Sequence, residues 1–131
     1  MITLPRTGLA PLVFSGSLLA AAGDRPNVKT SWAVRWHSGQ LYRADLGAFV
    51  LLLKFNTEQK DEFDRETVLT ASDLAGILDL VKKYDPVRWL DDYPAHARWD
   101  ARREKRNRQI QAQLDEVIEE LMSQAGLTET L

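Results

Sequence analysis

The chain contains no cysteine, and this absence removes several classes of protein at once. A disulfide framework, a thiolate nucleophile and a cysteine-ligated metal site all need that residue. The two histidines, His37 and His96, leave few candidates for an imidazole base. No apolar run reaches about 18 residues, so we expect no membrane-spanning helix. The lack of cysteine is compatible with the cytoplasm, where we expect the chain to act.

A strong charge excess is also missing, because the formal net charge is −2. This value excludes a globally basic nucleic-acid binder but leaves room for a local basic patch. A length of 131 residues suits one domain with one core. We therefore expect a single domain over residues 1–131, with a long helix at its end that extends from the body.

Motifs that carry catalysis are absent as well. The sequence has no glycine-rich phosphate loop, no G-x-S-x-G elbow and no calcium-binding loop. Asp92, His96 and Asp100 stand four residues apart, which on one continuous helix would place them on one face. Pro94 favours a helix that begins after Asp92, so we expect no metal site there. The prediction is a chain that is not an enzyme and holds no cofactor or metal.

The most apolar stretch is Ala48–Phe55, and it predicts the centre of the fold. Phe49, Leu51, Leu53 and Phe55 would share one face of a strand, while Val50 and Leu52 would lie on the other. A strand that is apolar on both faces is typical of a central strand covered above and below.

Other strands are predicted on both sides of this one. Pro5 and Gly8 indicate an irregular arm over residues 1–10. The apolar stretch that follows loosely resembles a secretory signal, but Ser15–Ser17 interrupts it and favours a strand. The predicted strands are Pro11–Ala21, about Lys29–His37, Leu41–Arg43, Ala48–Phe55 and Phe63–Leu69. Leu41–Arg43 is either a short separate strand or part of one bent strand with a bulge at Gly39.

Side-chain alternation assigns faces in the second of these strands. Trp32, Val34 and Trp36 would face the core, which directs Arg35 and His37 toward solvent. His37 is then expected to be a surface or rim histidine.

Two helices follow the strands. Thr70 and Asp73 resemble a capping box that would open a helix over Ala71–Tyr84, and Pro86 would end it. A second helix is predicted from about residue 94 to residue 125, with Gly126 as its C-terminal cap. The fold class is therefore α+β, with a small antiparallel sheet of three to five strands over residues ~11–69 followed by two helices.

The last helix carries the residues that we single out for binding. About 30 residues give a helix about 45 Å long, which exceeds the roughly 35 Å diameter of a domain of this size. Its early part has no apolar stripe and is rich in basic residues: Arg98, Arg102, Arg103, Lys105, Arg106 and Arg108. Three interpretations stay open, namely a solvated helix face, contact with DNA or RNA phosphates, and contact with an acidic protein.

The later part of the same helix is amphipathic. Its apolar stripe includes Ile110, Leu114, Val117 and Leu121. This stripe either covers the sheet of its own chain or forms an interface with another protein or a second copy. Acidic residues on its outer side would match the basic part in an antiparallel homodimer.

The favoured prediction is a non-catalytic binding module, an accessory or regulatory component of a nucleic-acid-handling system. Its phosphate contacts would come from the basic part of the last helix. The alternative is a protein–protein adaptor or inhibitor that uses this helix and the acidic loop 58–66. The sequence does not separate DNA, RNA and protein as the partner.

Overall fold

The structure is a computed structural model that describes residues 1–23, 35–59, 62–90 and 97–127, with side chains of 97–99 left out. Its elements in chain order are β1 (Ile2–Arg6), β2 (Leu9–Phe14), β3 (Gly16–Ala22), β4 (Arg35–Ala44), β5 (Phe49–Thr57), β6 (Arg65–Ala71), α1 (Leu74–Lys83) and α2 (Ala97–Gln124). All strand pairs are antiparallel, in a β1-β2 hairpin and a four-stranded sheet of order β3-β4-β5-β6. The predicted α+β class is confirmed.

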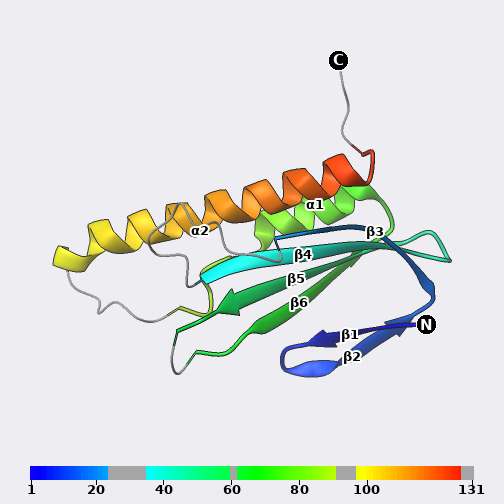
Figure 1. The fold of residues 1–131 in the computed structure, drawn as a ribbon, viewed down its shortest axis with the longest axis horizontal. Coiled ribbons are helices and arrows are strands. Elements are labelled where there is room, and N and C mark those ends of the chain that lie inside the picture. Colours follow the sequence, from blue (N-terminus) through cyan, green and yellow to red (C-terminus); the bar gives the residue numbers. More distant parts are fainter. Residues whose placement is uncertain (24–34, 60–61, 91–96, 128–131) are drawn as a thin grey trace, which may run out of the picture.

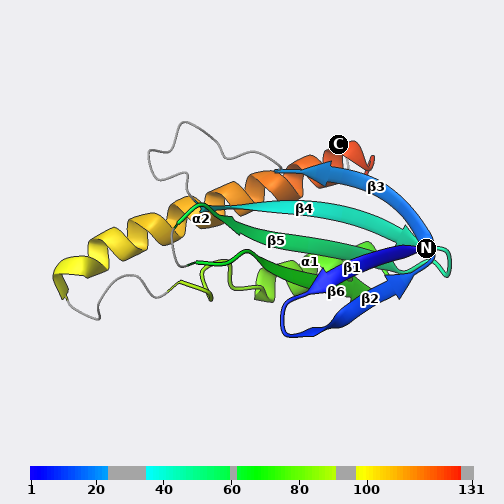
Figure 2. The same cartoon turned by 60° about the horizontal axis from the view of Figure 1, so that its bottom comes forward.

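Helices and hairpin cover opposite faces of the four-stranded sheet (Figures 1 and 2). The α2 helix packs over β3 and β4, and α1 packs over β5 and β6. On the other face, Leu4 of the hairpin joins Tyr42, Val50 and Leu52 in a second apolar cluster. The sheet is therefore the middle of three layers.

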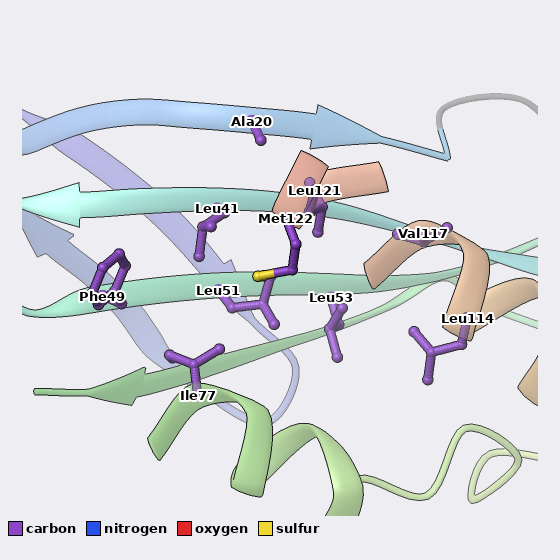
Figure 3. Packing of buried hydrophobic residues seen from close by; sticks show 10 residues of the cluster. All are labelled: Ala20, Leu41, Phe49, Leu51, Leu53, Ile77, Leu114, Val117, Leu121 and Met122. Carbon is purple, nitrogen blue, oxygen red and sulfur yellow. The ribbon is translucent and has the colours of Figure 1, made fainter. Parts of the chain in front are cut away.

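The apolar strand is central, as the sequence predicts. Leu51 and Leu53 are fully buried on the helix side with Ile77 of α1, as Figure 3 shows. Val50 and Leu52 are buried on the hairpin side. A strand with two apolar faces must be covered on both, and here the helices cover one face and the β1-β2 hairpin covers the other.

The predicted irregular arm at residues 1–10 is wrong, because these residues include β1 and the start of β2. The register of the hairpin shifts between Leu4 and Arg6, on either side of Pro5. Gly8 has a φ of 77°, a left-handed conformation that suits a tight turn. The two residues that indicated an irregular arm are thus the irregular point and the turn of a hairpin.

The single strand predicted over Pro11–Ala21 is also wrong, since the chain changes sheets at Ser15. Gly16 lies so close to β4 that a Cβ there would be 2.4 Å from the backbone oxygen of Arg43. A glycine is required at this crossing.

One strand, β4, runs through the position where a turn or a bulge at Gly39 was considered. Its pairing with β5 is regular from Arg35 to Arg43. The register shift lies instead in β3, between Leu18 and Ala20.

Both helices lie near their predicted positions, with one change of cap. Asp73 is itself the N-cap of α1, and its Oδ1 accepts a hydrogen bond from the N–H of Gly76 at 2.7 Å. The prediction that Thr70 caps this helix is wrong, because β6 continues to Ala71. At the end of α2, Gly126 has a φ of 69° and Leu127 donates to the Met122 carbonyl at 2.9 Å, as expected for a glycine-terminated helix.

Candidate functional site

Helix α2 has a docked half and a projecting half. Its C-terminal half lies along the sheet, whereas its N-terminal half continues past the edge of the sheet where β4 begins (Figures 1 and 2). The docked half buries the four apolar residues predicted as a protein interface, which are Ile110, Leu114, Val117 and Leu121. At 0–6% exposure these side chains are buried within their own chain.

The projecting half carries the predicted basic residues. Arg102, Lys105 and Arg108 are exposed, and they follow one another every three residues on one side of α2. Arg103 and Arg106 are half-buried on the side that turns toward the body. Arg98 belongs to α2, but its side chain lies outside the described part of the chain. The basic segment is therefore divided between a solvent face and a body face.

Arg106 faces an ion pair at the end of the sheet. Arg35 binds Glu62 through both carboxylate oxygens, with 3.0 Å between its Nε and Oε1, and Thr57 donates to Oε1 at 2.7 Å. The hydrogen bond from Arg35 is the main reason that the pKa of Glu62 is lowered, with Arg106 adding a smaller attraction. Burial and the nearby Arg35 lower the pKa of Arg106. The body face of the projecting half therefore lies within electrostatic range of the end of the sheet.

His37 contradicts the expected surface position, because it is fully buried on the helix side of β4. Its Nε2 is 2.8 Å from the hydroxyl of Tyr84, and its ring packs edge-on against Phe55. Burial lowers the pKa of His37 to about 4 and raises that of Tyr84 to about 12. Within the described residues of this strand, the predicted faces are thus reversed for Arg35 and His37, while Trp32 and Val34 lie outside the described part of the chain.

The side chain of Gln113 in α2 bonds the backbone of His37 as a neighbouring strand would. The β3 strand pairs with β4 only as far as Gly39, so His37 has no β3 partner. The side-chain amide of Gln113 takes that place, accepting from the His37 N–H and donating to its carbonyl, each at 2.7 Å. This contact fixes the register of α2 on the sheet.

We expect Gln113→Ala to lower the free energy of unfolding by about 1–3 kcal/mol, because it leaves two buried backbone groups without partners. Urea denaturation of both proteins would measure the difference. Gln111→Ala is the matched control, since Gln111 is exposed and bonds only Asp115 among the described residues. Equal losses from the two variants would contradict the role of Gln113.

Three carboxylates of the acidic loop 58–66 are engaged within the chain, whereas Asp61 lies outside the described residues. Glu62 pairs with Arg35, and Asp64 accepts from the Thr57 N–H and pairs with Lys54. Glu66 accepts from the Thr7 hydroxyl. These contacts reduce the acidic surface that an adaptor would offer.

The described part of the chain offers neither a metal-binding cluster nor a membrane-spanning helix. Among the described residues, no group of three or more acidic or histidine side chains is placed to hold a metal ion. Asp92 and His96 lie outside those residues, so the metal arrangement considered with Asp100 is not described. No described helix is long and apolar enough to cross a membrane.

Comparison with known proteins gives no family for the chain. No protein-family model, no curated protein and no solved structure matches it. The functional argument therefore rests on the residues of this chain alone.

Proposed function

We propose that the chain is a non-catalytic binding module, an accessory or regulatory component of a nucleic-acid-handling system. It contacts backbone phosphates through the projecting half of α2. The observation that carries this proposal is the exposed series Arg102, Lys105 and Arg108 on a helix segment that stands past the sheet (Figure 1).

The chemistry of the series suits phosphates. From Arg102 to Arg108 the helix rises about 9 Å, so the three side chains spread along one side of α2. Arginine forks bind phosphate oxygens with two parallel hydrogen bonds, and lysine binds them as a point charge. Backbone contact of this kind needs no apolar surface, which agrees with the polar character of the segment.

An acidic protein is the alternative partner for the same cations. The adaptor interpretation also needs the acidic loop 58–66 as a binding surface. Glu62 and Asp64 already bond within the chain, which weakens that interpretation. Nucleic acid is therefore the partner that we propose.

The double variant Lys105→Glu/Arg108→Glu tests the proposal. Both residues are exposed, so the protein should fold normally while phosphate contacts become repulsive. We expect the variant to bind fluorescein-labelled oligonucleotides at low salt roughly tenfold more weakly than the wild type, or worse. Fluorescence anisotropy would measure both affinities.

Lys82→Glu/Lys83→Glu is the matched control, because it makes the same change in net charge on the last turn of α1. This control should bind almost as well as the wild type. Equal weakening in both double variants would mean that overall charge, not α2, governs binding. No binding by the wild type at low salt would overturn the proposed function.

A further inference from the structure

A second group of cations lies at the end of the sheet where β6 begins, and it includes two aromatic rings. The guanidinium carbon of Arg65 is 5.9 Å from the ring centroid of Phe63 and 5.2 Å from that of Trp89. The guanidinium carbon of Arg88 lies 4.3 Å from the Trp89 centroid. These four residues, which we name the arginine–aromatic cluster, come from the β6 start and from the segment after α1.

The charges of this cluster have no partner within the described part of the chain. Neither Arg65 nor Arg88 forms an ion pair there. Two described carboxylates next to Arg65 have other partners, since Asp64 pairs with Lys54 and Glu66 accepts from the Thr7 hydroxyl. Two guanidinium groups are thus ordered by rings while their N–H edges stay available to an anion.

Phe63 adds an open ring face to these cations. It is 71% exposed, unusual for a side chain of its size and apolar character. Arg65 lies over the ring, and most of the side chain remains accessible to solvent. A flat apolar surface beside two guanidinium groups matches a nucleotide, whose base stacks and whose phosphate is anionic.

The start of β6 and the projecting half of α2 lie toward the same end of the sheet (Figure 1). Arg106 of α2 lies close enough to Glu62 to lower its pKa, and Glu62 directly precedes Phe63. A nucleic-acid strand bound to α2 could therefore extend along the surface to the arginine–aromatic cluster.

We propose that the partner is single-stranded nucleic acid, with an unpaired base stacked on Phe63 and a neighbouring phosphate held by Arg65 and Arg88. This inference rests on the proposed function, because α2 supplies the remaining phosphate contacts. In a duplex the base faces are already stacked on one another, so the Phe63 ring distinguishes a single strand from a double strand.

Phe63→Ala and Phe63→Tyr test the stacking. The probes are a fluorescein-labelled oligothymidylate and a duplex, each about 20 nucleotides long, which exceeds one stacking site. We expect Phe63→Ala to weaken oligothymidylate binding at least about fivefold and Phe63→Tyr to preserve it, since tyrosine keeps the stacking face. Duplex binding should be weaker than oligothymidylate binding and unchanged by either variant.

Leu46→Ala is the matched control, because Leu46 is a fully exposed apolar residue in the turn at the other end of β5. It should bind like the wild type. If Lys105→Glu/Arg108→Glu weakens binding while Phe63→Ala does not, the stacking inference is overturned and the proposed function stands. Tighter binding of the duplex also overturns this inference. Absence of any nucleic-acid binding overturns both.

Discussion

Replacing Leu114 by aspartate should unfold the isolated chain. Leu114 is 1% exposed and packs in the core cluster with Leu53 and Ile77 (Figure 3). Truncating such a leucine alone costs about 2–5 kcal/mol, and an unpaired buried carboxylate adds several more. A chain of this length has a total stability of about 5–15 kcal/mol, so the loss is comparable with the whole. Far-UV circular dichroism and urea denaturation would measure it.

Ala112→Asp is the control for that experiment, because it places the same carboxylate on the exposed side of the same helix. It should change stability by less than about 1 kcal/mol. A Leu114→Asp protein that stays folded but loses self-association would show instead that the stripe is an interface, as one interpretation of the sequence had it.

Lowering the pH from 7 to 4 should remove about 3 kcal/mol of stability through His37 alone. Its pKa is about 4 in the folded chain, against 6.5 for an unburied histidine. A shift of one pKa unit corresponds to about 1.4 kcal/mol, so the shift here gives about 3 kcal/mol. Because the unfolded chain binds the proton more tightly, this stability is complete above pH 6.5 and is lost as the pH falls toward 4. The lowered pKa of Glu62 adds a loss that begins only below about pH 4.5, at the acidic end of this window, because that carboxylate must then be protonated.

His37→Phe separates this effect from the rest of the titration. The variant keeps an aromatic ring but leaves the Tyr84 hydroxyl without its imidazole partner, so it should be less stable at pH 7. The difference between the two stability curves should shrink as the pH falls from 6.5 to 4. A constant difference, or a His37 pKa near 6.5 by NMR titration, would contradict the burial.

Periodicity predicted the parts of the fold that depend on long apolar patterns. The strand Phe49–Thr57 and the docked half of α2 were found this way, because both bury residues at regular spacing. The hairpin was missed because Pro5 and Gly8 ordinarily mark irregular chain, and here they mark a register shift and a turn. Local signals do not say whether a break ends a strand or joins two.

The candidate site residues also differ in how far the sequence could predict them. The exposed cations of α2 could be predicted because a helix segment without apolar residues has to be solvated. His37 was assigned to the wrong face, since alternation gives two sets of residues but not which set is covered. No pattern in the sequence predicted the arginine–aromatic cluster. Trp89 follows α1 in the chain and reaches Arg65 only in the folded structure.

The salt dependence of binding tests the central claim that the projecting half of α2 contacts phosphates. Affinity for the labelled oligothymidylate would be measured over a range of salt concentrations for the wild type and for Lys105→Glu/Arg108→Glu. Each lost contact with a single strand reduces the slope of log affinity against log salt by about 0.7, so the wild-type slope should be steeper by about 1.4. Parallel lines for the two proteins would contradict phosphate contact by Lys105 and Arg108.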